Sequence, residues 1–134
     1  MLDSIHSRPR MPRLAIVVPC HDEEAMLPVT LATLSAVIEE LVDQRLVAAE
    51  SYVCCVDDGS RDRTWALICD AARRTTRVRG LQLTRNFGQQ GAMLAGLLEA
   101  DADVYVTIDA DLQDDETRIR DMLLRYADGY DVVY

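Results

Sequence analysis

Two aspartates one residue apart follow an apolar run late in the chain, in the sequence Val104-Tyr105-Val106-Thr107-Ile108-Asp109-Ala110-Asp111-Leu112-Gln113-Asp114. Alternate residues of a β-strand face the same side, so Asp109 and Asp111 are predicted to present their carboxylates to one point. Gln113 would add a carbonyl oxygen if the backbone stays extended. Such oxygen ligands suit Mg²⁺ or Mn²⁺, which keep other positions for water and substrate phosphate. The alternative is that both aspartates only end a strand and cap the next helix.

The length and net charge of the chain limit the functions in which these carboxylates could take part. The 134 residues are enough for one domain with a substantial core. The net charge of -9 and the pI near 4.5 argue against a nucleic-acid partner, because phosphate backbones are bound by clustered Lys and Arg. All 14 basic residues are Arg, and the lack of lysine excludes mechanisms that need an amine, such as Schiff bases or a P-loop lysine.

The cysteines and the N-terminal residues indicate the compartment. The chain has four cysteines without C-x-x-C spacing: Cys20, Cys54, Cys55 and Cys69. They are predicted to be buried, reduced thiols, which favours a cytoplasmic location. Residues 1–13 are expected to be a flexible segment, because the apolar run after them, Leu14 to Val18, is too short for a signal peptide or a membrane span. The sequence contains no apolar run of about 18 residues.

Short apolar runs alternate with helical patterns along the chain. Strands are predicted at 14–18, where Pro19 would stop the strand, and at 52–56, 78–84 and 104–108, with a fifth beginning at 131–134. Helices are predicted from near Asp22–Glu24 to Val42, after a cap at Ser60 or Asp62, over 88–100 and over 116–126. This alternation predicts an α/β fold with a mainly parallel sheet and helices on both faces.

Three polar clusters directly follow predicted strands: Pro19–Glu24, Asp57–Ser60 and Asp109–Asp111. Ligands of parallel sheets bind beyond the carboxyl ends of the strands, so we expect the clusters to meet at one edge. Three acidic clusters would repel one another at neutral pH unless a cation or hydrogen-bond donors lie among them. Their convergence therefore favours a functional site over three separate helix caps.

Several nucleotide-binding motifs are absent from the sequence. No G-x-G-x-x-G follows the first strand and no G-x-x-x-x-G-K-[ST] occurs, which excludes dinucleotide-dehydrogenase and P-loop proteins. A receiver domain would need a lysine that this chain lacks. A haloacid-dehalogenase-type phosphatase also has an aspartate pair one residue apart. Its pair usually lies near the start of the domain and precedes a hydroxyl residue where Gln113 stands, so this alternative fits less well.

Four motifs occur in order along the chain: Val17-Val18-Pro19-Cys20-His21-Asp22-Glu23-Glu24, Val56-Asp57-Asp58-Gly59-Ser60-Arg61-Asp62-Arg63-Thr64, Arg85-Asn86-Phe87-Gly88 and Asp109-Ala110-Asp111-Leu112-Gln113-Asp114. Through them, the chain resembles family 2 glycosyltransferases of the GT-A fold from about Leu14 to Tyr134. The last two motifs are most similar to the polyprenyl-phosphate subgroup, which includes dolichol-phosphate mannosyltransferase-like and bactoprenol glucosyltransferase-like enzymes. The resemblance implies a Rossmann-like GT-A fold, incomplete at its C-terminus, with residues 14–134 as the N-terminal nucleotide-sugar-binding part.

The resemblance implies a role for each matching residue. The nucleotide-sugar site would consist of Pro19, His21, Glu23, Asp57, Asp58, Asp109, Ala110, Asp111 and Gln113. Within it, the residues up to Asp58 would surround the nucleoside, whereas Asp109, Asp111 and Gln113 would hold Mg²⁺ or Mn²⁺ and, through it, the diphosphate. His21-Asp22 stands where family members more often have Tyr-Asn, so a stacking role for His21 is less firmly implied. Arg85 would contact a phosphate or a sugar hydroxyl, or it is a surface residue.

The implied reaction is an inverting transfer of sugar from a nucleotide diphosphate sugar, of the UDP-glucose or GDP-mannose type, to a polyprenyl phosphate at the cytoplasmic face of the membrane. Asp109 and Asp111 are the expected catalytic residues, because a bound cation neutralises the leaving diphosphate. A lipid phosphate is already ionised, so no general base is required. The family's acceptor-binding half and the membrane helices common in the subgroup are not in this sequence. The alternative function is therefore a module that binds a nucleotide sugar without turnover.

Overall fold

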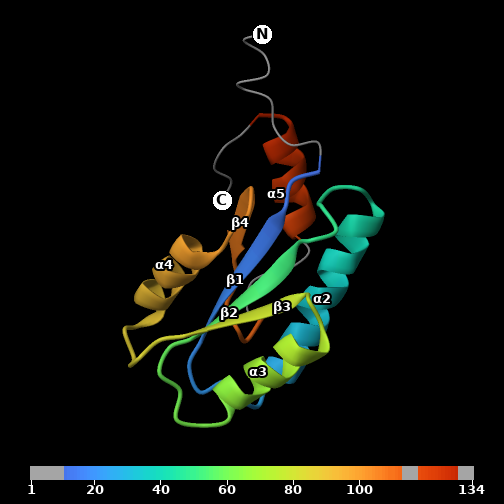
Figure 1. Ribbon diagram of the computed structural model, residues 1–134. Helices are drawn as coiled ribbons and strands as arrows, with labels where there is room; N and C mark the ends of the chain where they lie inside the picture. The colour runs from blue at the N-terminus through green and yellow to red at the C-terminus, as the bar shows by residue number, and fades with distance from the viewer. Residues whose placement is uncertain (1–10, 113–117, 130–134) are drawn as a thin grey trace.

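The computed structural model describes residues 11–112 and 118–129 (Figure 1). The strands are β1 (Leu14–Cys20), β2 (Tyr52–Asp57), β3 (Val78–Gln82) and β4 (Val104–Thr107). The helices are α2 (Leu27–Asp43), α3 (Thr64–Arg74), α4 (Gln89–Glu99) and α5 (Arg118–Ala127). The predicted fifth strand at 131–134, Gln113, and most of the N-terminal segment 1–13 lie outside the described residues.

The strands form a parallel sheet in the order β3-β2-β1-β4, as the alternation of strands and helices predicts. Helices α2, α3 and α5 cover one face and α4 covers the other, so the prediction of helices on both faces is confirmed (Figure 1). The chain moves outward from β1 to β3 and then returns to add β4 on the other side of β1. The strand order therefore reverses between β1 and β4, and ligands of open α/β sheets bind at such a reversal.

Strand β1 is buried on both faces because it lies inside the sheet. Leu14, Ile16 and Val18 belong to the core under α2, α3 and α5, whereas Ala15 and Val17 belong to the core under α4. The same alternation separates the adjacent cysteines, since Cys55 lies in the first core and Cys54 in the second. Cys20, Cys54 and Cys55 are buried free thiols, as predicted, whereas Cys69 is only half-buried.

The prediction that Pro19 ends the first strand is wrong, because β1 continues through Pro19 to Cys20. The Val17 carbonyl accepts from the amide of Ile108, so alternate residues of β1, Pro19 among them, direct their backbone groups toward β4. The pairing of β1 with β4 ends at Val17 and Thr107. Pro19 therefore lies beyond the part of β1 that pairs with β4. Its missing N–H does not cost the sheet a hydrogen bond.

Helix α2 begins at Leu27 and not near Asp22–Glu24, as the sequence pattern predicted. Asp22 has a φ of 51°, which is not helical, and a proline occupies the first turn of α2. Helix α3 begins at Thr64, and neither predicted residue is its N-cap, although the Asp62 carboxylate accepts from the Thr64 amide at 2.8 Å. β3 also ends two residues before the predicted Thr84. No helix in the described part of the chain is long and apolar enough to cross a membrane.

The close packing of α4 on the sheet gives a stability test at Gly96. A Cβ atom there would lie 2.5 Å from Val17 Cγ1 and 2.8 Å from Val56 Cγ2. We expect Gly96→Ala to lower the free energy of unfolding by about 1–3 kcal/mol, measured by urea denaturation, because overpacking outweighs the gain in helix propensity. Gly91→Ala is the matched control on the same helix, since its Cβ would meet the Cβ of exposed Phe87 at 3.0 Å. Equal stability of the two variants would contradict this packing argument.

Candidate functional site

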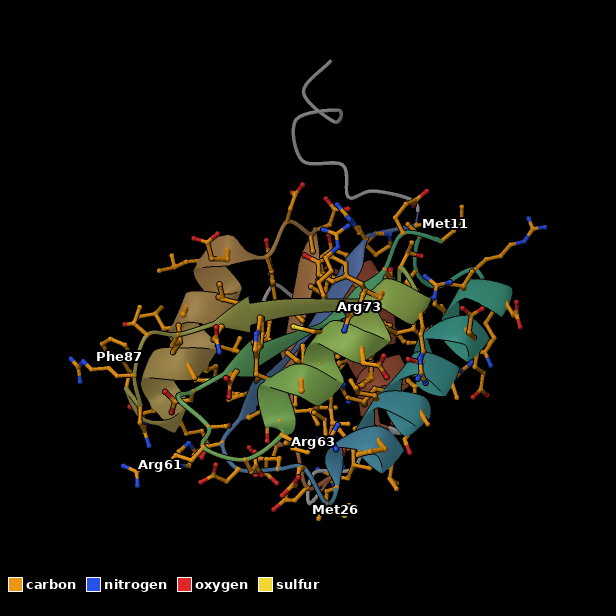
Figure 2. The ribbon with its side chains drawn as sticks, turned by 60° about the horizontal axis from the view of Figure 1, so that its bottom comes forward. Met11, Met26, Arg61, Arg63, Arg73 and Phe87 are labelled. Carbon is orange, nitrogen blue, oxygen red and sulfur yellow. The ribbon has the colours of Figure 1, made fainter. Side chains whose placement is uncertain are left out.

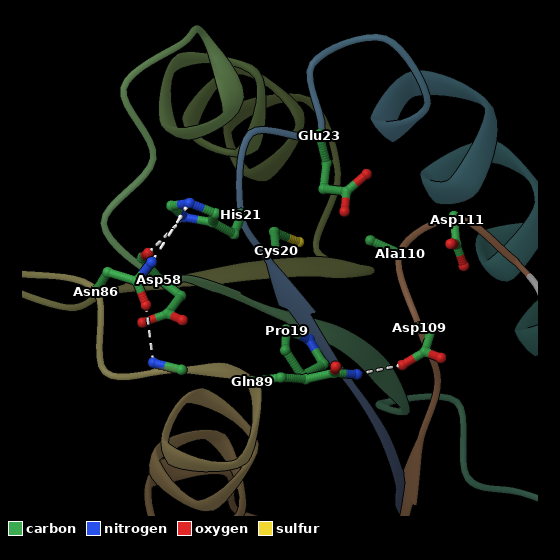
Figure 3. A pocket seen from close by; sticks show the side chains of 11 residues that line it. Pro19, Cys20, His21, Glu23, Asp58, Asn86, Gln89, Asp109, Ala110 and Asp111 are labelled. Carbon is green, nitrogen blue, oxygen red and sulfur yellow. Dashed lines mark hydrogen bonds between the residues drawn. The ribbon is translucent and has the colours of Figure 1, made fainter.

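A cleft of about 380 Å³ opens at the carboxyl ends of β1 and β4, where the strand order reverses (Figure 3). Its lining residues are Pro19, Cys20, His21, Glu23, Asp58, Asn86, Gly88, Gln89, Asp109, Ala110 and Asp111. In Figure 3, His21, Asp58 and Asn86 lie on one side and Asp109 and Asp111 lie on the other. The structure thus brings together most of the residues predicted for the site, from all three polar clusters.

Asp109 and Asp111 reach the cleft by a different local structure from the predicted one. β4 ends at Thr107, and the two aspartates lie in a turn in which the Leu112 amide donates to the Asp109 carbonyl at 3.1 Å. Leu112 has a φ of 57°, so the backbone does not stay extended toward Gln113. Both carboxylates nevertheless line the same cleft. The two aspartates thus share a cleft, but through a turn and not through the predicted strand alternation, and the meeting of their oxygens at one point stays a prediction.

Buried Ala110 anchors the turn between the two aspartates. Its carbonyl accepts a hydrogen bond from the hydroxyl of Thr30, a fully buried residue of α2. A buried backbone carbonyl needs such a partner, because leaving it unpaired away from water is costly. The turn that carries Asp109 and Asp111 is therefore fixed to α2, whose core also contains Ala110.

The loop after β1 is held by side chains of the loop after β2. The consecutive amides of Asp22, Glu23 and Glu24 donate to Ser60 Oγ at 2.9 Å, Thr64 Oγ1 at 2.9 Å and Asp62 Oδ2 at 3.2 Å. In return, the Asp22 carboxylate accepts from the Arg61 amide at 2.8 Å. These bonds hold Asp22 in its loop with a φ of 51°, and this non-helical backbone is why the helix does not start there.

His21 joins both of these loops to the loop after β3. Its Nδ1 lies 2.8 Å from the Asp58 carbonyl, which can only accept, so Nδ1 carries the proton. The Asn86 Oδ1 accepts from the Gly88 amide at 2.8 Å, which turns its Nδ2 toward His21 Nε2 at 3.4 Å. In the tautomer that fits these contacts, His21 donates at Nδ1 and accepts at Nε2. The Asp22 carboxylate lies 3.5 Å from the same Nε2.

The adjacent residues Asp57 and Asp58 line different clefts. Asp58 lines the first cleft, and its Oδ1 accepts from the Phe87 amide at 2.7 Å. Asp57 lies at the same edge of the sheet, as predicted for the clusters, but lines a second cleft of about 570 Å³ beyond the ends of β2 and β3. Its Oδ1 accepts from the Ser60 amide at 3.1 Å, whereas its buried Oδ2 has no hydrogen-bond partner among the described residues. His21 and Asn86 line both clefts and separate them.

The gathered carboxylates affect the protonation of Glu23. Burial raises the pKa of Glu23 above its ordinary value of 4.5, and the negative charges of Asp111, Asp62 and Asp109 raise it further, whereas His21 opposes the shift. Burial is thus the largest cause of the raised pKa of Glu23, and the charges of the aspartates add to it. No group of three or more His, Cys, Asp and Glu side chains within residues 11–112 and 118–129 is arranged to hold a metal ion. Asp109 and Asp111 both line the first cleft, but they do not form such a group.

The sequence analysis missed three residues of the first cleft that follow β3. Asn86, Gly88 and Gln89 line it, although they were not predicted to belong to the site. Their position directly after a strand was the available signal, because ligands bind at the carboxyl ends of strands. Arg85 lines the second cleft, with its guanidinium 4.0 Å from the ring centre of Phe87, which projects outward beside α4 in Figure 2.

Residues 15–134 match the sequence model of glycosyl transferase family 2. Over 125 residues the chain is 47% identical to the uncharacterized glycosyltransferase YkoT of Bacillus subtilis (strain 168), covering 92% of this chain and 37% of that protein. Over 121 residues it is 40% identical to the undecaprenyl-phosphate 4-deoxy-4-formamido-L-arabinose transferase of Pseudomonas aeruginosa (strain LESB58), covering 90% and 34%. The chain thus spans about a third of the length of the curated relatives it matches.

Solved structures are similar in fold. Staphylococcus aureus TarS 1-349 in complex with UDP-GlcNAc gives a TM-score of 0.61 at 19% identity, covering 87% of this chain and 31% of that one. The mannosyltransferase PcManGT from Pyrobaculum calidifontis, in complex with GDP-Man and Mn²⁺, gives 0.56 at 22% identity, covering 75% and 28%. At this identity the likeness concerns the fold alone, and it confirms the predicted GT-A fold.

The raised pKa of Glu23 predicts a pH-dependent stability. The folded chain holds this proton more tightly than the unfolded chain, so the free energy of unfolding falls as pH rises from about 4.5 through the raised folded pKa. We expect Glu23→Gln to remove this contribution, so that the variant gains stability over the unsubstituted chain as pH rises through that window. Urea denaturation across pH measures the difference. Glu24→Gln, which removes an exposed charge next to Glu23, should show no such trend, and equal trends in both variants would contradict the assignment.

Proposed function

Because the chain belongs to glycosyl transferase family 2, we propose that it forms the donor-binding part of an enzyme that transfers sugar from a nucleotide diphosphate sugar to a lipid phosphate. Family membership also rules out the phosphatase alternative. The observation that carries the proposal is the first cleft, in which Asp109 and Asp111 face His21 and Asp58 across the end of β1. One side of this cleft suits a diphosphate with its cation, and the other side leads to the second cleft.

The nucleoside is proposed to reach from the first cleft into the second. His21 and Asn86 line both clefts. Asp57 lines the second cleft, and one of its carboxylate oxygens is buried without a partner among the described residues. A buried carboxylate oxygen favours a ligand that donates a hydrogen bond. Uracil offers its N3–H and guanine its N1–H. Pro19 and Glu23 would complete the wall of the first cleft beside the ribose and diphosphate.

The aspartate pair fits a divalent cation by the chemistry of its donors. Asp109 and Asp111 supply carboxylate oxygens to one cleft, and the raised pKa of Glu23 is consistent with unneutralised negative charge there. Magnesium commonly binds through one or two carboxylates and substrate phosphates, so three protein ligands are not required. We propose that Asp109 and Asp111, with Gln113, hold Mg²⁺ or Mn²⁺. When bound, the cation would stabilise the negative charge that develops on the leaving nucleotide diphosphate.

The acceptor is proposed from the relatives. A Pseudomonas aeruginosa relative 40% identical to this chain is named an undecaprenyl-phosphate transferase. We propose a polyprenyl phosphate acceptor, with transfer at the cytoplasmic face of the membrane by a single displacement that inverts the anomeric carbon. An ionised phosphate is a nucleophile without proton removal, so the carboxylates of the cleft are left to hold the donor. Asp109 and Asp111 would act as catalytic residues by fixing the diphosphate.

Substitution of Asp111 tests the cation site. We expect UDP or GDP to bind the chain more tightly with Mn²⁺ than with EDTA, measured by titration calorimetry. Asp111→Asn should lower the Mn²⁺-dependent part of the affinity at least tenfold, since even indirect partners of a metal contribute about 10-fold to 100-fold to affinity. Asp101→Asn is the control, because this exposed aspartate precedes β4 at the opposite end of the strand. Unchanged Mn²⁺-dependent binding in Asp111→Asn would contradict the proposed site.

Substitution of Asp57 separates nucleotide recognition from folding. In Asp57→Asn the remaining side-chain oxygen can still accept from the Ser60 amide, and an NH₂ group, which donates, replaces the second oxygen. We expect nucleotide affinity to fall roughly 10-fold to 100-fold, as for a lost hydrogen bond to a charged group. The free energy of unfolding should stay equal or rise, because a buried unpaired charge is removed. A parallel loss of stability and affinity would indicate a structural role for Asp57 instead.

A further inference from the structure

The segment between β3 and α4, residues 83–88, is fixed from several sides. The Phe87 amide donates to Asp58 at 2.7 Å, and Asn86 contacts His21 at 3.4 Å. A Cβ atom on Gly59 would lie 2.5 Å from the Asn86 nitrogen, so only a glycine lets this segment approach so closely. The first turn of α4 thereby has a defined position relative to the end of β2.

Gln89, the first residue of α4, extends from this fixed position across the first cleft. Its Nε2 donates to Asp109 Oδ1 at 2.5 Å, as the dashed line in Figure 3 shows. This contact joins segments 20 residues apart in sequence, on opposite sides of the carboxyl end of β1. A side chain at a helix end that is held by these contacts is well suited to orient a carboxylate.

The chemistry of the glutamine amide suits a partner of a cation-binding carboxylate. An arginine at this position would form an ion pair with Asp109 and compete with a cation for its charge. The amide is neutral, so it restricts the rotation of the carboxylate and leaves its negative charge in place. Partners of this kind orient metal ligands in many proteins, and removing them typically lowers metal affinity about 10-fold to 100-fold.

We propose that Gln89 is a positioning residue that holds the Asp109 carboxylate in the orientation needed to bind the cation and the donor diphosphate. The inference rests on the proposed function, because it assumes that Asp109 is a cation ligand. Gln89 contacts Asp109, and its contribution to transfer is indirect. The segment of residues 83–88, which precedes Gln89, also contacts Asp58 and His21 on the proposed nucleoside side of the cleft.

Calorimetric titration of UDP into the 134-residue chain tests the proposal, with Mn²⁺ at several concentrations and with EDTA. Mn²⁺ is expected to raise the affinity for UDP, and the readout is the Mn²⁺ concentration that gives half of this increase. We expect Gln89→Ala to raise that concentration about tenfold. The affinity for UDP in EDTA should be unchanged. Gln89→Asn should behave like Gln89→Ala, because its side chain is one carbon shorter. Gln90→Ala is the matched control, since Gln90 is also an exposed glutamine of the first turn of α4 but does not line the cleft.

Each outcome bears on a different claim. A normal Mn²⁺ dependence in Gln89→Ala, or one shared with Gln90→Ala, overturns the role of Gln89 and leaves the proposed function intact. An equal loss of UDP affinity with Mn²⁺ and with EDTA also overturns it, because the effect would then act through the nucleoside side or the fold. Absence of Mn²⁺-dependent binding in the unsubstituted chain overturns the proposed cation site and, with it, this inference.

Discussion

The parallel pairing of β1 with both β2 and β4 is the constraint on which the rest of the structure depends. It buries β1 on both faces, and it forces the chain to return across the sheet after β3. The loop after β1 therefore leads to α2 on one face of the sheet, whereas the connection after β3 leads to α4 on the other face. The first cleft opens between these segments and the turn after β4. Because β4 stops pairing at Thr107, the end of β1 is free to place Pro19 and Cys20 at the floor of that cleft.

The loops around the cleft are fixed by side chains that accept from backbone amides. Asp57, Asp58, Asp62, Ser60 and Thr64 each accept from an amide of the same or a neighbouring loop. Amide donors favour the ionised carboxylates, which lets many acidic groups gather without unfolding the edge of the sheet. Glu23 makes no such carboxylate contact in the described structure, and its raised pKa is consistent with the remaining repulsion.

The sequence predicted the strands and the meeting of the polar clusters because both follow from local patterns. A strand buried on both faces is a continuous apolar run, and the residue after it lies at the ligand-binding edge. The start of α2 was predicted wrongly, because Asp22 has a non-helical φ of 51° in a loop that is bonded to the segment after β2. The contact of Gln89 with Asp109 was not predicted either, since residues 20 positions apart meet only through the order of the strands. Patterns along the chain do not contain such contacts.

The spacing of the two aspartate pairs explains their different outcomes. Adjacent residues at the end of a strand point to opposite sides, so Asp57 and Asp58 are divided between the second and first clefts. Asp109 and Asp111 are one residue further apart, and even in a turn their carboxylates line one cleft while buried Ala110 anchors the backbone between them. The first pair is therefore suited to contact two parts of one ligand, and the second pair to share one cation. In the proposed function the Asp57-Asp58 pair could not replace the Asp109-Asp111 pair, because its two carboxylates line different clefts.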